Sequence, residues 1–194
     1  MNSQAKVVQV RALTLAVVVA ATLLASAQAQ AASKQHVVTV KGTLHAVFDA
    51  VPDQSLCAAQ GGEYVVRPTD YLWWSATSTL KGTFTGTGRH CGHSTSLNPD
   101  GSASYVETTT FTGRVAGCGR GSVIYNVHGV LRPAFDASRR AVPTDEHWKI
   151  AAHSGTAGLR GLTSGSGHGP AWMNVDTSLD ADVLGHVTCT PTAG

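Results

Sequence analysis

The sequence has 194 residues, with 14 lysines and arginines against 12 aspartates and glutamates, for a formal net charge of +2. The surplus positive charges, Lys6 and Arg11, lie near the N-terminus, so the rest of the chain lacks the basic surplus that a nucleic-acid-binding protein needs. Only 13% of the residues are charged, and Thr, Ser and Gly are abundant, which is typical of secreted β proteins whose sheet surface consists of hydroxyl groups.

The N-terminal segment has the parts of an export signal. A positive start is followed by an apolar run, residues 12–24, that is too short to span a bilayer, and then by alternating alanines that provide cleavage sites. We therefore expect residues 1–31 to be a signal peptide and residues 32–194 to form one secreted β-barrel domain. No later run is long and apolar enough for a membrane helix, so we expect no membrane association after cleavage.

Alternation of apolar and polar residues with period two predicts a first strand over residues 36–49. A connection with several glycines and prolines, residues 50–70, follows it. Connections of that length are often functional, and this one either folds over a barrel end as a lid or forms a surface loop tied down by Cys57. A second strand is expected over residues 71–86, with Trp74 on its apolar face.

The third strand places Tyr105, Glu107, Thr109 and Phe111 on one face and a row of threonines, which we expect to be solvated, on the other. Five more strands are expected over residues 122–131, around Trp148, and over 155–162, 171–177 and 183–190, with a flexible turn at 164–169. These elements predict an all-β fold, a closed or nearly closed antiparallel barrel of about eight strands with meander topology. A two-sheet sandwich is the alternative.

The chain has four cysteines, and an even number in an exported protein predicts two disulfides. Successive loops of a meander alternate between the two ends of the sheet. On the expected strand order, Cys57 and Cys118 lie at one end, and Cys91 and Cys189 lie at the other. We therefore predict the pairs Cys57–Cys118 and Cys91–Cys189.

Several short glycine-containing pieces occur in the order seen in one known family. They are residues 100–106 (DGSASYV), 111–113 (FTG), Gly121-Ser122, Gly129, Trp148, 154–156 (SGT) and 159–162 (LRGL). Together they resemble an uncharacterised bacterial family that is built like the allene-oxide-cyclase barrels. The resemblance covers most of residues 37–167 and implies a small antiparallel barrel with a central cavity and no established activity. The glutamate that is usual in the family would fall at Thr109, whereas this chain has Glu107.

Glu107 is the sharpest candidate for chemistry, because a carboxylate on an inward face is costly unless it is paired or hydrogen-bonded. Such groups are enriched at functional sites, and Glu107 can serve as a general acid or base or as an anchor for a bound molecule. The structural alternative is a solvated glutamate near the barrel mouth, or one that pairs with an arginine such as Arg114.

Aromatic residues on the inward faces are candidates for ligand contact, although they equally suit the filling of a packed barrel. These are Trp74, Tyr105, Phe111, Tyr125 and Trp148. We expect no cofactor and no metal. His90 and His93 flank a cysteine that an exported protein uses in a disulfide, and the sequence has no metal-ligand motif.

Three functions fit these features. The first is a secreted barrel that binds a small apolar or aromatic molecule in its central cavity. The second is a cofactor-free cyclase or isomerase that uses Glu107 for proton transfer or electrostatic stabilisation. The third is a structural or interaction protein whose interior is completely filled by its own side chains.

Overall fold

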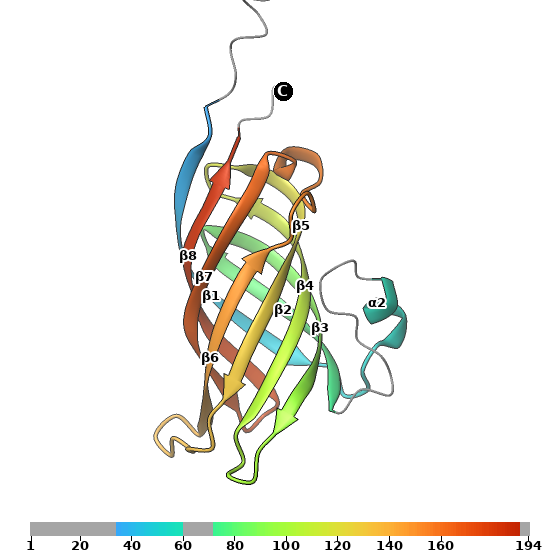
Figure 1. Ribbon diagram of the computed structural model, residues 1–194, viewed down its shortest axis with the longest axis vertical. Helices are drawn as coiled ribbons and strands as arrows, with labels where there is room; N and C mark the ends of the chain where they lie inside the picture. The colour runs from blue at the N-terminus through green and yellow to red at the C-terminus, as the bar shows by residue number, and fades with distance from the viewer. Residues whose placement is uncertain (1–33, 60–71, 191–194) are drawn as a thin grey trace, which may run out of the picture. The chain divides into compact units, whose positions relative to one another are not determined.

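The computed structural model describes residues 34–59 and 72–190, and the strands in these ranges form a closed antiparallel barrel (Figure 1). The elements are β1 His36–Phe48, α2 Gln54–Ala59, β2 Trp73–Gly82, β3 Phe84–Leu97, β4 Ala103–Val115, β5 Gly119–Leu131, β6 Ala141–Ile150, the 3₁₀ turn η1 Ala157–Leu159, β7 Leu162–Asn174 and β8 Ser178–Cys189. Each strand pairs with the next along the chain, and β8 pairs with β1. The predicted eight-stranded meander barrel is therefore confirmed.

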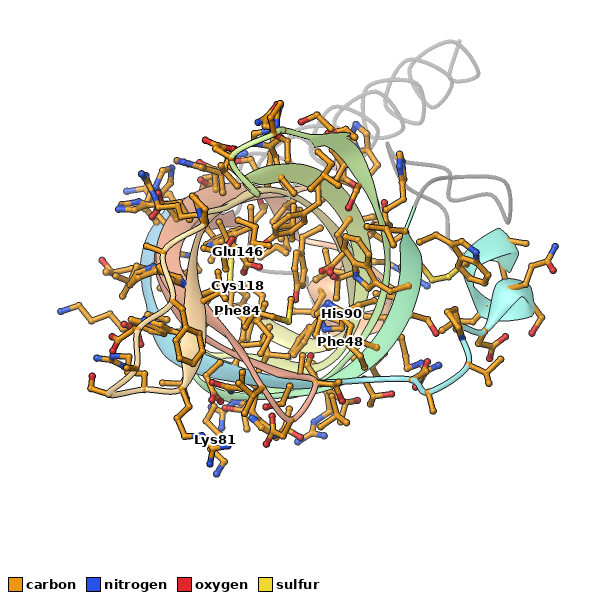
Figure 2. All side chains as sticks on the ribbon, turned by 90° about the horizontal axis from the view of Figure 1, so that it is seen from below. Phe48, Lys81, Phe84, His90, Cys118 and Glu146 are labelled. Atoms are coloured by element: carbon orange, nitrogen blue, oxygen red, sulfur yellow. A yellow bond between two sulfur atoms is a disulfide. The ribbon has the colours of Figure 1, made fainter. Side chains whose placement is uncertain are left out.

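Pairing of the first strand with the last closes the sheet along nearly their whole lengths. The register runs from His36 opposite Cys189 to Val47 opposite Ser178. Because every backbone hydrogen-bonding edge is paired, alternate side chains of all the strands must point into one interior. Seen along the barrel, Phe48, Phe84, His90 and Glu146 lie inside the ring of strands, whereas Lys81 points away from it (Figure 2).

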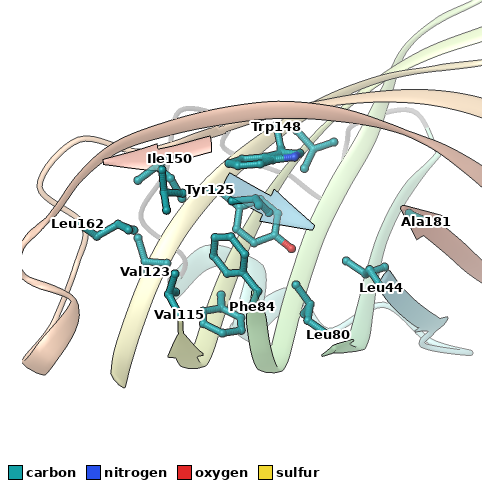
Figure 3. Packing of buried hydrophobic residues seen from close by; sticks show 14 of the residues in the cluster. Leu44, Leu80, Phe84, Val115, Val123, Tyr125, Trp148, Ile150, Leu162 and Ala181 are labelled. Carbon is teal, nitrogen blue, oxygen red and sulfur yellow. The ribbon is translucent and has the colours of Figure 1, made fainter. Parts of the chain in front are cut away.

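The two ends of the barrel differ in how they are filled. The closed end, which carries the β2–β3 and β4–β5 turns, is packed with apolar side chains (Figure 3). Phe111, Val115 and Val123 are fully buried there, and Leu159 of η1 inserts over them from the connection between β6 and β7. The open end carries the β1–β2, β3–β4, β5–β6 and β7–β8 connections, and its interior is hollow.

The expected number of strands is correct only because two errors compensate: one expected strand is two strands, and another is not a strand. Residues 71–86 do not form one strand, because Gly82 adopts a φ of 114°, a backbone shape suited to glycine, and the chain reverses there between β2 and β3. Conversely, the strand expected over residues 155–162 is a connection that contains η1. The flexible turn expected at 164–169 lies inside β7.

The disulfides are Cys57–Cys91 and Cys118–Cys189, so both predicted pairings are wrong. The missing strand explains the error, because each additional strand moves all later loops to the opposite end. Cys118 lies in the β4–β5 turn, at the same end as Cys189, and Cys91 lies within β3 instead of following the second strand. Two disulfides are consistent with an oxidising environment.

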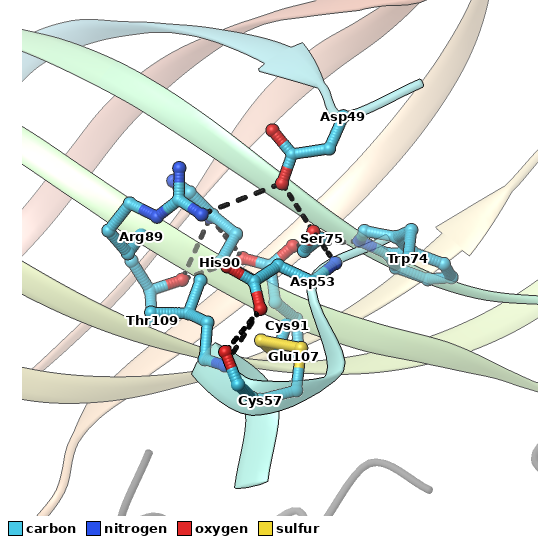
Figure 4. The surroundings of a disulfide bond; sticks show 12 residues. Asp49, Asp53, Cys57, Trp74, Ser75, Arg89, His90, Cys91, Glu107 and Thr109 are labelled. Atoms are coloured by element: carbon cyan, nitrogen blue, oxygen red, sulfur yellow. Dashed lines mark hydrogen bonds and ion pairs between the residues drawn. A yellow bond between two sulfur atoms is a disulfide. The ribbon is translucent and has the colours of Figure 1, made fainter. Parts of the chain in front are cut away.

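The beginning of the long connection after β1 packs against the outer wall of the barrel, where Cys57 of α2 is joined to Cys91 (Figure 4). For this connection the sequence left two alternatives, a lid over a barrel end and a surface loop tied down by Cys57. The described part is the tied surface loop. The remainder, residues 60–71, and the predicted signal peptide lie outside the described residues. Within the two described ranges, no helix is long and apolar enough to cross a bilayer.

We expect peptide mapping without reduction to recover Cys57 joined to Cys91 and Cys118 joined to Cys189. The second disulfide spans 71 residues and ties the end of β8 to the barrel, so removing it with Cys118→Ala and Cys189→Ala should lower the free energy of unfolding by up to roughly 4 kcal/mol. The matched control is Cys57→Ala with Cys91→Ala, whose disulfide spans 34 residues and anchors α2 to the outer wall. A peptide that contains Cys57 joined to Cys118 would contradict the observed strand order.

Candidate functional site

The hollow end of the barrel contains a cavity of about 410 Å³, which is large enough for a small ligand. All the strands except β3 contribute large side chains to its wall, and two carboxylates form part of its lining. The cavity is lined by Phe48, Leu72, Trp73, Trp74, Ser94, Ala103, Tyr105, Glu107, Leu131, Glu146, Met173, Asn174, Thr177 and Leu179. Its lining is therefore mainly apolar and aromatic, with a few polar groups that can orient a ligand.

The aromatic side chains lie against the wall because glycines on neighbouring strands make room for them. A Cβ atom at Gly92 would overlap the Trp74 ring, and one at Gly129 would overlap the Tyr105 ring. The Trp74 and Tyr105 rings meet edge to face with their centroids 5.6 Å apart. Placing the rings over glycines keeps them out of the centre, and the cavity stays open in consequence.

Glu107 is buried on the inward face of β4 and is held by three side chains. His90 Nδ1 lies 2.6 Å from Glu107 Oε1, and the Thr109 hydroxyl donates to the same oxygen at 2.7 Å. The Trp74 indole nitrogen donates to Oε2 at 3.4 Å. The His90 and Glu107 side chains are only 4% and 13% exposed, so this is a buried ion pair when His90 is protonated.

The partners of Glu107 decide its charge. Burial alone would raise the pKa of this carboxyl, but the charge of His90 and the hydrogen bonds from His90, Thr109 and Trp74 together hold the pKa below its ordinary value. Glu107 is therefore ionised at neutral pH. It does not pair with Arg114, which is exposed near the far end of β4.

Glu146, on the inward face of β6, has the opposite character. Tyr105 donates its hydroxyl to Glu146 Oε1 at 2.6 Å, and the same hydroxyl lies 3.0 Å from Thr144 Oγ1. Burial and the negative charge of Glu107 raise the pKa of Glu146 to about 7, against an ordinary value of 4.5. Near neutral pH this carboxyl is therefore present in both its protonated and its ionised form. Two carboxyls whose pKa values are driven apart in one cavity are characteristic of acid–base and binding sites.

Beneath the large cavity lies a smaller inner cavity of about 40 Å³, which Phe48, Glu107, Glu146 and Leu179 also border. That volume exceeds the space that one water molecule needs. Tyr125 and Trp148 line it too, and the buried Tyr125 hydroxyl has no hydrogen-bond partner among the described residues. The neighbouring Thr109 hydroxyl donates to Glu107 instead. An unsatisfied buried hydroxyl beside a cavity is a position at which a ligand or water would gain a hydrogen bond.

Four of the five aromatic residues predicted to contact a ligand line one of the two cavities. Trp74 and Tyr105 line the large cavity, and Tyr125 and Trp148 line the inner one. Phe111 does not, because it is fully buried at the closed end and packs edge to face on Phe84 at 5.2 Å. Ligand contact by the other four stays a prediction.

Glu146 and His90 are the site residues that sequence reasoning missed. Glu146 lies two residues before Trp148, so the alternation that placed Trp148 inward would also have placed Glu146 inward. His90 lies beyond the expected second strand, which ends at residue 86, so the alternation could not place it. On β3 it points inward while Cys91 points outward. In the described part of the chain, no three His, Cys, Asp or Glu side chains gather as a metal ion would require.

His90 also links Glu107 to a serine, because His90 Nε2 lies 2.6 Å from Ser78 Oγ. Serine, histidine and carboxylate in this order resemble the hydrogen-bonded relay of a hydrolase. Ser78, however, is almost fully buried and does not line either cavity. A nucleophile must reach its substrate, so we interpret Ser78 as the group that fixes the orientation of the His90 ring.

No family model matches this sequence, and no curated protein is similar enough to count as a relative. Among solved structures, the chain is similar to a crystal structure from Shewanella oneidensis MR-1, a protein of unknown function from the DUF3224 family. The TM-score is 0.47 and the sequence identity 17%, over 81% of this chain and 100% of that one. These comparisons establish no function for the barrel, and its resemblance to allene-oxide-cyclase barrels stays a prediction.

The raised pKa of Glu146 predicts a specific pH dependence of stability. The folded state binds this proton more tightly than the unfolded chain does, so the stabilising contribution is complete below a pH of 4.5 and is lost as the pH rises through about 7. Glu146→Gln imitates the protonated group. Denaturant titrations should show a higher free energy of unfolding than in the wild type at about pH 8, and little difference at about pH 5.

The comparison variant is Glu107→Gln. The pKa of Glu107 is lowered, so its stabilising contribution is present above a pH of 4.5 and is lost as the pH falls. This variant should be less stable than the wild type at neutral pH, because His90 loses its counter-charge. A Glu146→Gln curve that runs parallel to the wild-type curve at every pH would contradict the assignment of Glu146.

Proposed function

We propose that this protein is a secreted barrel that binds a small, mainly apolar or aromatic molecule in the cavity at its open end. The observation that supports this function most strongly is the aromatic-lined cavity of about 410 Å³, which shares Glu107, Glu146 and other wall residues with the inner cavity. An apolar wall with a few convergent polar groups is the usual composition of a small-molecule site. The predicted signal peptide and the two disulfides fit an exported carrier or sensor, which we propose to be bacterial.

The division of the barrel supports binding over a purely structural role. A scaffold gains stability from a filled interior, and the closed end is filled in that way by Phe84, Phe111 and their neighbours. At the open end, aromatic rings lie flat on glycines and two carboxyls face the hollow, which costs burial energy without improving packing. Such an arrangement is expected where a ligand completes the core.

The opposite pKa shifts of Glu107 and Glu146 favour a second candidate function, that of a cofactor-free cyclase or isomerase. Glu107 is an ionised base, Glu146 is an acid near neutrality, and Tyr125 offers a free hydroxyl to a developing oxyanion. This set suits proton transfer next to a carbonyl group.

We expect N-phenyl-1-naphthylamine, a neutral apolar fluorophore, to bind the purified mature protein saturably, with one site per chain. Leu179 borders both cavities, so Leu179→Trp should fill part of their volume and weaken binding by roughly tenfold or more. Leu184→Trp is the matched control, because Leu184 is exposed on the outer face of the same strand. Both variants must keep the wild-type circular dichroism spectrum. Equal binding by the two variants would place the fluorophore outside the cavity, and no saturable binding by the wild type would contradict the proposed function.

For the second candidate, we expect the wild type to accelerate hydrogen–deuterium exchange at the carbon next to the carbonyl of 2-tetralone in D₂O. Glu107→Gln removes the base, so it should abolish the acceleration while the thermal unfolding transition stays cooperative. NMR spectroscopy of the ketone follows the exchange. Acceleration that persists in Glu107→Gln would rule out this residue as the base, and no acceleration by the wild type would remove this candidate.

A further inference from the structure

The charges around the two cavities are unbalanced, and this imbalance bears on the chemistry of the ligand. Glu107 and Glu146 face both cavities. Their only basic neighbour in either lining is His90, and neither lining includes a lysine or arginine from the described residues. His90 pairs with Glu107 at 2.6 Å, and no lysine, arginine or histidine in the described part of the chain forms an ion pair with Glu146.

The unpartnered Tyr125 hydroxyl is an independent indication that the inner cavity receives a polar group. It is more than nine-tenths buried and lines the cavity that Glu146 also lines. Burial raises the pKa of the Tyr125 phenol well above its ordinary value, so the group stays a neutral hydroxyl that can accept or donate a hydrogen bond. The polar group that enters therefore meets one hydroxyl and at least one carboxyl.

We infer that the ligand carries a protonated amine on an aromatic or apolar body, with the ammonium group paired with Glu146 in the inner cavity. This inference rests on the proposed binding function and names the chemical class of the ligand. An ammonium group donates three hydrogen bonds, which suits the Glu146 carboxylate and the Tyr125 oxygen. An anionic head would meet the acidic groups without a lysine or arginine in either lining to neutralise it.

The walls of the large cavity suit the rest of such a ligand. Trp74 and Tyr105 present aromatic surface close to the two carboxyls, and aromatic faces attract cations that have lost part of their water shell. The apolar body would lie between Phe48, Leu131 and Met173. Glu146 holds a proton part of the time near neutral pH, so pairing with a cation must displace that proton.

Three probes with the same aromatic body and different heads test the inference by calorimetry: 2-phenylethylamine, 2-phenylethanol and phenylacetate. At about pH 8 we expect the wild type to bind the amine roughly tenfold more tightly than the alcohol, and the carboxylate most weakly. The advantage of the amine should shrink as the pH falls below about 6, because Glu146 becomes protonated. Amine binding near pH 7 should release protons to the buffer.

Glu146→Gln should remove the advantage of the amine and leave the affinity for the alcohol unchanged. Asp145→Asn is the matched control, because Asp145 is the adjacent residue on β6, points outward and pairs with Arg132, so it should bind all three probes as the wild type does. If N-phenyl-1-naphthylamine binds but the amine has no advantage over the alcohol, the inference fails and the proposed function stands. If neither the fluorophore nor any probe binds, both fail. Tightest binding of phenylacetate would also overturn the inference.

Discussion

Closure of the sheet between β1 and β8 is the constraint on which the rest of the structure depends. Once every strand edge is paired, every second side chain of each strand points into a common interior. An eight-stranded barrel is just wide enough to be filled by side chains or to hold one small ligand. In this chain apolar residues fill the closed end, whereas flat aromatic rings over glycines leave the open end hollow.

The polar groups inside the barrel are difficult to explain by stability alone. A buried ion pair such as His90–Glu107 contributes little on balance, because its mutual attraction is offset by the loss of hydration, and apolar residues of similar volume often stabilise a protein as well or better. Glu146 destabilises the fold further when it ionises. The same groups become useful when a ligand enters, because a carboxyl in a water-poor cavity interacts strongly with a complementary charge. Their presence in the cavity wall supports the proposed binding function.

Period-two alternation was sufficient to predict the class of fold and the inward position of Glu107. It failed at residues 71–86, because the alternation continues through Gly82 and nothing in the side-chain pattern marks the reversal that this glycine permits. It failed again at residues 155–162, where the sequence pattern of a short connection resembles that of a strand. Each error moves the later loops to the opposite end of the barrel. The disulfide pairs therefore could not be predicted, although the presence of disulfides could.

The site was predicted only in part for a related reason. Glu107 was recognisable from its own strand, whereas its partners come from other strands whose register depends on the turns between them. Gly92 lies opposite Glu107, which sets His90 of β3 beside the carboxylate, and Glu146 joins the cavity from β6. The pKa values of the two glutamates depend on these long-range neighbours and could not be read from local sequence.

The charge state of the interior is the central claim, and NMR titration of the glutamate side-chain carboxyl carbons tests it most directly. The sequence contains three glutamates, Glu63, Glu107 and Glu146, so a labelled sample gives few resonances, and single Glu→Gln variants assign them. The structure predicts that Glu146 titrates at a pH of about 7, and that Glu107 titrates below its ordinary value. If Glu107 and Glu146 both titrate at the ordinary value of 4.5, the cavity holds no such paired carboxyls and the account is wrong.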